Sequence, residues 1–188
     1  MSGTARTILV RAARAADVAA MPALEQAAGE LFRTIPDLAH IADGGNRGEQ
    51  CYRTLVAGGW CRIAEDGQRD MCGFICAERH GAELNIWELA VRLERQRLGI
   101  GSRLLAVTIQ AAARCHVESV TLTTFSDVAW NAPFYERLGF RRVPRRNLDA
   151  RLRAILRSEA EAGLPIRRRC AMRLTLASFD KDMGNGTE

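Results

Sequence analysis

The sequence has few features that are typical of a membrane protein, a secreted protein or a metal-binding protein. No apolar run approaches the roughly 18 residues of a membrane-spanning helix, and the N-terminal run Ile8–Val10 is too short for a signal peptide. The six cysteines include no CxxC pair, which argues against a metal site. Cys72, Phe74 and Cys76 share one face of a predicted strand, so we expect them to lie in the hydrophobic core. The sequence therefore favours a cytoplasmic protein with no metal.

Lysine is almost absent, because Lys181 is the only lysine among the 27 basic residues. The formal net charge of +5 suits an anionic cofactor or weak attraction to nucleic acid. Many arginines fall between positions 141 and 169, but no aromatic residue interleaves with them. Such a pattern is typical of a solvated helix face, so nucleic acid is not expected as a partner. Strongly salt-dependent binding to RNA or DNA would support the alternative.

Length and composition indicate one globular domain. The chain has 188 residues, of which 47% are hydrophobic and 26% are charged, and these are ordinary values for a protein with a single core. We expect the domain to cover residues 1–177. The polar segment 178–188 is expected to be a disordered tail.

The stretch from Leu84 to Gln110 predicts a strand, a glycine turn and a helix. Leu84–Val91 is apolar and short enough for a buried strand. After Gly99 and Gly101, apolar residues recur at helical spacing. The turn therefore lies just before a helix N-terminus, where free N–H groups and the positive dipole end receive anionic oxygens, above all phosphates.

The residues of the turn exclude two common phosphate sites. No Lys-Ser/Thr pair follows the glycines, so the turn is not a P-loop. A dinucleotide fingerprint needs a third glycine at position 104, where Leu104 stands. An ordinary glycine turn without a ligand stays an alternative at this point.

Turn residues and hydrophobic patterns predict the other elements. Strands are expected at Thr7–Ala12, Trp60–Glu65, Met71–Arg79, Glu83–Val91, Ser119–Phe125, Phe140–Val143 and Arg169–Leu176. Helices are expected from an N-cap at Asp17 to Phe32, over Gln50–Ala57, before Gly139, and over 147–163. Because a helix joins the strands Glu83–Val91 and Ser119–Phe125, we expect these two strands to be parallel neighbours.

Two motifs together resemble the GCN5-related N-acetyltransferases (GNAT). Gln96-Arg-Leu-Gly-Ile-Gly101 resembles the acetyl-CoA motif of that superfamily, and Phe134-Tyr-Glu-Arg-Leu-Gly-Phe140 resembles its short helix and following strand. The resemblance covers Trp60–Val143. It implies a single-domain α/β (α+β) fold with a mixed, mostly antiparallel sheet of six to seven strands. That sheet would have a splayed central parallel pair and flanking helices. The helix at about 147–163 would be an insertion, serving as a lid or as the surface of a homodimer.

The resemblance implies transfer of an acetyl group from acetyl-CoA to a primary amine in one ternary complex. Glu88 is the candidate base, because it is the only acid in the core of its strand and apolar neighbours raise a carboxyl pKa. An ion pair between Glu88 and an arginine on a neighbouring strand is the alternative, and Asp127 and Glu25 are weaker candidates for the base. Tyr135 matches the family position of the acid that protonates the thiolate; a packing role is its alternative.

The same resemblance implies the residues that bind acetyl-CoA. They are Leu89, Ala90, Val91, Gln96, Arg97, Leu98, Gly99, Ile100, Gly101 and Ser102. The family often has an asparagine seven residues before the tyrosine, where Val128 stands here. Asn131 either takes a related cofactor contact or caps its helix. No catalytic metal is implied.

The acceptor stays open. A small-molecule amine, an aminoglycoside and a peptide or protein N-terminus all remain possible substrates, as does a module that senses CoA or another ligand without turnover. Glu25, Phe32 and Tyr52 are candidates for the acceptor pocket. For the two aromatic residues, packing in the core is the alternative.

Overall fold

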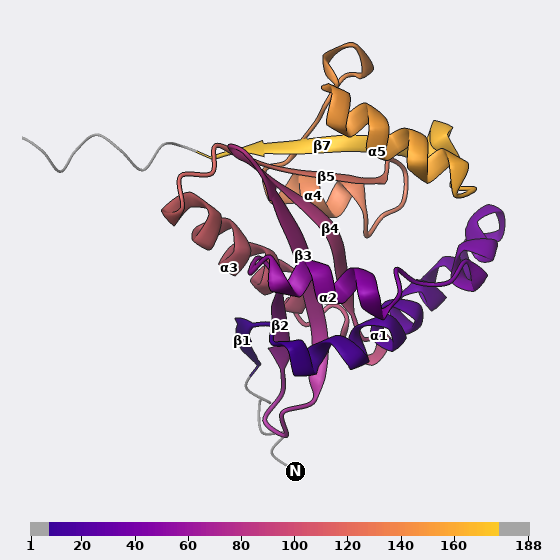
Figure 1. Cartoon of the computed structure of the whole chain (residues 1–188). Coiled ribbons are helices and arrows are strands. Elements are labelled where there is room, and N and C mark those ends of the chain that lie inside the picture. The colour runs from indigo at the N-terminus through magenta and orange to yellow at the C-terminus, as the bar shows by residue number, and fades with distance from the viewer. Residues whose placement is uncertain (1–7, 177–188) are drawn as a thin grey trace, which may run out of the picture. The chain divides into compact units, whose positions relative to one another are not determined.

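The computed structural model describes residues 8–176 and contains one seven-stranded mixed sheet (Figure 1). The strand order is β1-β2-β3-β4-β5-β7-β6. The strands are β1 (Leu9–Ala12), β2 (Arg62–Glu65), β3 (Met71–His80), β4 (Glu83–Val91), β5 (Ser119–Phe125), β6 (Arg141–Arg142) and β7 (Arg169–Thr175). The predicted fold class is confirmed. The predicted tail at 178–188 lies outside the described residues.

Strands β4 and β5 form the expected parallel pair. The N–H of Glu118 donates to the carbonyl of Ala82, and the side chain of Thr121 bonds to that of Asn85, three residues further along both segments. The bonded positions thus advance in the same direction along both segments, so the two strands are parallel. A connection through a crossover helix requires this arrangement. The pairs β1–β2, β2–β3, β5–β7 and β6–β7 are antiparallel.

Helices precede, connect and follow the strands. The α-helices are α1 (Met21–Gly29), α2 (Glu49–Ala57), α3 (Ile100–Arg114), α4 (Ala132–Arg137) and α5 (Ala150–Glu161). Short 3₁₀ segments lie at Ala15–Ala20, Glu30–Thr34, Pro36–Asp43, Leu93–Arg95, Arg145–Asn147 and Ile166–Arg168. Across the described residues, no helix is long and apolar enough to cross a membrane.

The first predicted helix is wrong in its start and in its continuity. The residue at the N-cap is Arg14, and Asp17 lies one turn later, where its carboxylate accepts the Arg14 N–H at 2.7 Å. The same carboxylate pairs with Arg11 at 2.8 Å. Proline has no N–H to donate, and Pro22 occupies the first turn of α1, so the α-helical pattern begins only at Met21 after a 3₁₀ segment.

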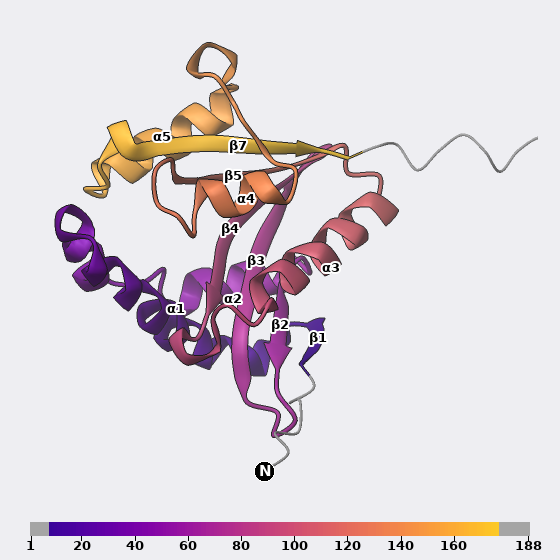
Figure 2. The same ribbon diagram turned by 180° about the vertical axis from the view of Figure 1, so that it is seen from behind.

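The chain divides into two compact units. The first takes in the described residues up to Glu78 together with Ile86–Thr108, and the second takes in Arg79–Asn85 and the described residues from Ile109 onward. In the first unit, α1 and α2 cover one face of β2 and β3, and the N-terminal half of α3 covers the other (Figures 1 and 2). Tyr52 and Phe74 pack edge to face in the core of this unit, with ring centroids 5.3 Å apart.

In the second unit, α4 and α5 lie on opposite faces of β5 and β7 (Figures 1 and 2). The predicted helix at 147–163 is α5, and Leu152 and Ile155 on it are buried. Its inner face also carries charge, because Arg151 pairs with Glu83, and Glu159 pairs with Arg169 at 2.7 Å. Apolar burial and ion pairs together attach this helix to its sheet.

Candidate active site

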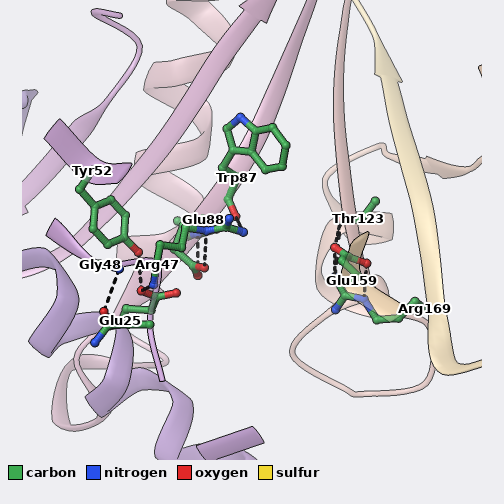
Figure 3. A network of polar contacts seen from close by, with 11 residues as sticks. Glu25, Arg47, Gly48, Tyr52, Trp87, Glu88, Thr123, Glu159 and Arg169 are labelled. Atoms are coloured by element: carbon green, nitrogen blue, oxygen red, sulfur yellow. Dashed lines mark hydrogen bonds and ion pairs between the residues drawn. The ribbon is translucent and has the colours of Figure 1, made fainter. Parts of the chain in front are cut away.

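Glu88 lies in the middle of β4 and is the centre of a polar cluster in the first unit (Figure 3). Its side chain is 25% exposed. Its carboxylate accepts the backbone N–H of Leu89 at 3.2 Å and lies 3.8 Å from the guanidinium of Arg47. The arginine partner therefore comes from the loop before α2 and not, as the alternative expected, from a neighbouring strand.

Glu25 and Tyr52 belong to the same cluster. The hydroxyl of Tyr52 on α2 donates to Oε2 of Glu25 on α1 at 2.7 Å, and the backbone N–H of Arg47 donates to the same oxygen at 2.9 Å. Burial and the neighbouring carboxylates raise the pKa of Tyr52, so its hydroxyl stays a donor. These two donors hold Glu25 in place.

The environment of Glu88 disfavours its ionised form. Burial is the largest cause, and the charge of Glu25 is the second; together they raise the pKa of Glu88 to about 7. The charge of Arg47 and the hydrogen bond from Leu89 act in the opposite direction. A carboxyl group with this pKa is divided between its acid and base forms near neutral pH, as proton transfer requires.

The end of β4 is fixed by three hydrogen bonds. The backbone N–H of Arg92 donates to the carbonyl of Cys72 at 2.8 Å, and the Arg92 side chain donates to the carbonyl of Met71 at 2.6 Å. The side chain of Gln96 donates to the carbonyl of Val91 at 3.2 Å. The side chain of Gln96, which was predicted as a cofactor contact, therefore binds the loop after β4 to the end of that strand.

The glycine turn lies directly before the N-terminus of helix α3. Arg97 and Gly99 have φ angles of +60° and +76°. Helix α3 begins at Ile100, and the N–H of Arg103 makes the bond to the carbonyl of Gly99. The N–H groups of the first turn therefore have no intrahelical partner. Gly101 lies inside this turn, so the positive φ belongs to Gly99 and not to Gly101.

Asn131 and Tyr135 lie in the second unit. Asn131 is the N-cap residue of α4, but its side chain makes no capping bond to that helix. Its Oδ1 instead accepts from Thr124 at 2.7 Å. Its amide nitrogen is buried and has no hydrogen-bond partner within residues 8–176, which leaves two donors for a ligand.

Tyr135 is 9% exposed and lies between two other rings. Its ring makes edge contacts with Phe134 at 5.0 Å and Phe140 at 5.6 Å. The backbone beyond it forms a Schellman motif: Phe140 N–H donates to the carbonyl of Tyr135, and Gly139 N–H to that of Glu136. Gly139 has a φ of +93°, which confirms the predicted left-handed residue after the helix.

The remaining predicted candidates have different surroundings. Asp127 forms an ion pair with Arg168 at 2.8 Å in the second unit. Tyr52 is fully buried and is both a core residue and a member of that cluster. Among residues 8–176, no group of three or more His, Cys, Asp and Glu side chains is arranged to hold a metal ion.

Arg47 is the residue that sequence reasoning missed. It lies in a loop between Asn46 and Gly48, and no local pattern marks it. The loop is fixed by a bond from the Gly48 N–H to Asn46 Oδ1 at 2.9 Å and by the positive φ of Gly48, +75°. A glycine-rich connection before a helix was the only available signal.

Comparison with known proteins identifies the domain. Residues 57–142 match the family model described as "Acetyltransferase (GNAT) domain", so the resemblance stated above is confirmed. The fold is similar to that of the ribosomal-protein-S18-alanine N-acetyltransferase from Escherichia coli, with a TM-score of 0.66 and 16% identity over 95% of this chain and 100% of that one.

Two further structures are similar to the same degree. PaiA N-acetyltransferase from Thermoplasma acidophilum, in complex with coenzyme A, has a TM-score of 0.66 and 12% identity over 90% of this chain and 99% of that one. An acetyltransferase of the GNAT family from Staphylococcus aureus Mu50 has a TM-score of 0.66 and 15% identity over 91% of this chain and 100% of that one. At these identities the similarity concerns the fold.

Proposed function

We propose that this chain, which carries a GNAT acetyltransferase domain over residues 57–142, transfers the acetyl group of acetyl-CoA to a primary amine by direct attack in a ternary complex. The observation that carries the proposal is Glu88: burial and a second carboxylate raise the pKa of this strand residue to about 7. A carboxyl group in that state accepts a proton at neutral pH.

The residues present fit acetyl-CoA, which supplies an acetyl thioester. The first turn of α3 offers the backbone N–H groups of Gly99, Ile100, Gly101 and Ser102 to the pyrophosphate. The exposed side chains of Arg97 and Arg103 add positive charge there. Leu89, Ala90 and Val91 offer main-chain groups to the pantetheine amides and the oxyanion. The buried, unpartnered amide of Asn131 is a further contact.

Glu88 would remove the proton that the acceptor amine must lose. An alkylammonium has a pKa of about 10.4, so only about 10⁻³ of it is neutral at pH 7. A base that takes this proton as the nitrogen attacks contributes about 10²–10⁴-fold to the rate. Glu88 would act directly or through a water molecule.

Tyr135 would supply the proton that the leaving thiolate takes up. The nitrogen–carbon bond forms, the carbon–sulfur bond breaks and the sulfur accepts the phenolic proton, so that no acyl-enzyme is needed. Tyr135 is 9% exposed, and a hydrogen bond from its hydroxyl to the developing thiolate would be stronger in such a low-dielectric environment than in water. The aromatic contacts of its ring hold it in one orientation.

Release of thiol from acetyl-CoA over a panel of primary amines tests the proposal. With an amine that is acetylated, kcat/KM should rise with pH through an apparent pKa near that of Glu88. The Glu88→Gln variant should lack this rising limb of the pH profile. Acceptors of different amine pKa separate the ionisation of the amine from that of the base. Binding of CoA by calorimetry with no thiol release on any amine would instead support a module that senses the ligand without turnover.

A further inference from the structure

The side chain of Arg47 is held beside Glu88 by its contacts with Trp87. Its Nη2 donates to the carbonyl of Trp87 at 2.8 Å, and its guanidinium carbon lies 5.4 Å from the centre of the Trp87 ring. Figure 3 shows this side chain together with those of Glu25 and Glu88. The guanidinium is therefore fixed on β4 by a hydrogen bond and a cation–π contact.

The gap between Arg47 and Glu88 is too long for a direct hydrogen bond. Arg47 Nε and Glu88 Oε2 are 3.8 Å apart, whereas a charge-assisted hydrogen bond joins atoms about 2.7–2.9 Å apart. Both side chains are partly open to solvent, with exposures of 34% and 25%. The cluster thus presents the guanidinium of Arg47 and the carboxylate of Glu88 side by side. Each of them can form a further hydrogen bond with a ligand.

From this pair we infer that the acceptor of the proposed transferase is a free α-amino acid, with its ammonium group at Glu88 and its carboxylate at Arg47. The inference rests on the proposed function.

The spacing of the two groups fits that ligand. In an α-amino acid, covalent geometry places the nitrogen about 2.7 Å from the nearer carboxylate oxygen. Two hydrogen bonds of about 2.8 Å then join this pair to the two side chains across the 3.8 Å gap. The four groups alternate in charge around a closed ring. A carboxylate separated from the amine by several more carbons would not close it.

The charged groups of the cluster favour a zwitterion over a simple cation. The guanidinium of Arg47 lies beside the carboxylate of Glu88, and the Arg47 backbone is bonded to Glu25. The cluster thus offers a carboxylate to the ammonium group and a guanidinium to the carboxylate of the same ligand. A polyamine or an aminoglycoside would bring another positive charge next to Arg47 and leave its guanidinium without a carboxylate.

The transfer balances in this arrangement. Glu88 accepts the first proton of the ammonium, and the neutral nitrogen attacks the acetyl carbon. The attacking nitrogen then loses its second proton, the carbon–sulfur bond breaks, and the sulfur gains one proton, through the hydroxyl of Tyr135 or through water, as CoA leaves. The α-carboxylate stays on Arg47 throughout, so Arg47 positions the nitrogen without exchanging a proton itself.

The experiment compares matched acceptors. Pools of the common amino acids are first assayed for thiol release from acetyl-CoA. For an active amino acid, its α-carboxamide and the amine that lacks the carboxyl group are then assayed in parallel. We expect kcat/KM to fall at least tenfold for the carboxamide and for the amine, because each loses the charge-assisted bonds to Arg47.

Arg47→Met and Arg53→Met supply the variant and its control. Arg53 lies on the nearby helix α2, is exposed and pairs with Glu49. Arg47→Met should raise KM for the amino acid at least tenfold and remove its advantage over the amine. Arg53→Met should change neither. Thermal unfolding and acetyl-CoA affinity show whether Arg47→Met is folded.

The outcomes separate the two proposals. Amines or peptides acetylated as well as amino acids by the unaltered protein would overturn the inference and leave acetyl transfer in place. The inference is also wrong if the folded Arg47→Met variant loses activity equally on the amino acid and on the amine. An absence of transfer to every primary amine would overturn the proposed function, and the inference with it.

Discussion

At the scale of single residues, the proposed chemistry depends on a small number of hydroxyl and carboxyl groups. Glu88 is held partly protonated by burial and by Glu25, and Tyr52 and the Arg47 N–H hold Glu25 in turn. Each of these groups can be changed by one substitution that preserves its shape. Their contributions can therefore be separated by kinetics.

Glu25→Gln should shift the pH dependence of the reaction. The amide oxygen still accepts hydrogen bonds from Tyr52 and Arg47, but the negative charge that raises the pKa of Glu88 is lost. The apparent pKa of the lower limb of kcat/KM should fall by about one unit, as expected for a neighbouring charge. Activity would then persist to lower pH. Glu30→Gln, an exposed change at a residue that pairs with Arg33, is the control; an unshifted limb in Glu25→Gln would contradict the coupling.

Tyr135→Phe deletes one hydroxyl and keeps the edge contacts of the ring with Phe134 and Phe140. If the hydroxyl protonates the thiolate, kcat should fall about 10²–10⁴-fold, while KM for acetyl-CoA should change little. A donor whose leaving thiol has a lower pKa should be less sensitive. The acid role is wrong if the folded, saturated variant keeps more than about a third of the wild-type rate.

At the scale of elements, the position of β4 depends on glycine at one point of β3. A Cβ atom on Gly73 would lie 2.8 Å from the carbonyl oxygen of Ala90 and 3.3 Å from the Cα of Val91. Both are backbone atoms, so neither can move without shifting the strand. β3 therefore approaches β4 more closely there than any side chain would permit.

Gly73→Ala should lower the free energy of unfolding by about 1–3 kcal/mol, the usual range for overpacking. It should also weaken acetyl-CoA binding, because Ala90 and Val91 supply candidate main-chain contacts. Gly67→Ala is the matched control: no atom lies within 4 Å of its added Cβ, and stability should stay within about 0.5 kcal/mol. Chemical denaturation and calorimetry measure both effects; equal stabilities of the two variants would refute the close approach.

The end of α4 allows a second test at this scale. Gly139→Ala places a side chain at a φ of +93° and 3.3 Å from Leu174, so it should destabilise the protein by about 1–2 kcal/mol. Gly29→Ala should do the reverse, stabilising by about 0.4–1 kcal/mol, because Gly29 has a φ of −64° and open space around its Cα. Opposite signs in urea denaturation would support the Schellman motif, and a neutral Gly139→Ala would argue against it.

At the scale of the whole molecule, Glu88 links folding to pH. A carboxyl group whose pKa is higher in the folded protein favours folding while it is protonated, and this contribution is lost as pH rises. The relevant window runs from about 4.5, the ordinary value, to about 7. Asp17 has the opposite sign, because its hydrogen bond with Arg11 lowers its pKa.

Glu88→Gln should therefore gain stability relative to the wild type as pH rises from about 4.5 to about 7. The gain should be at most about 3 kcal/mol, since the side chain is a quarter exposed and solvent weakens the effect. Denaturation across this range measures it. Glu161→Gln, an exposed change at the end of α5, should show no such trend, and a pH-independent difference for Glu88→Gln would contradict the raised pKa.

Much of the fold could be predicted from local patterns. The bounds of β4 and β5 match the predicted ones because their apolar runs end at turns or polar residues. The glycine turn and the left-handed Gly139 followed from the restricted conformations of other residues. The predicted start of the first helix was wrong. The carboxylate of Asp17 accepts a backbone N–H from inside the first turn, and it could equally have done so from the N-cap position.

By itself the sequence determined the strands, the helix after the glycine turn and the two motifs of the acetyltransferase domain, since each depends on residues a few positions apart. Only the tertiary structure decided which side chains surround Glu88. Glu25, Arg47 and Tyr52 come from α1, a loop and α2, far from β4 along the chain. Their meeting depends on how α1 and α2 pack on the sheet. That packing is a long-range balance of burial and hydrogen bonds, which leaves no local pattern at Arg47.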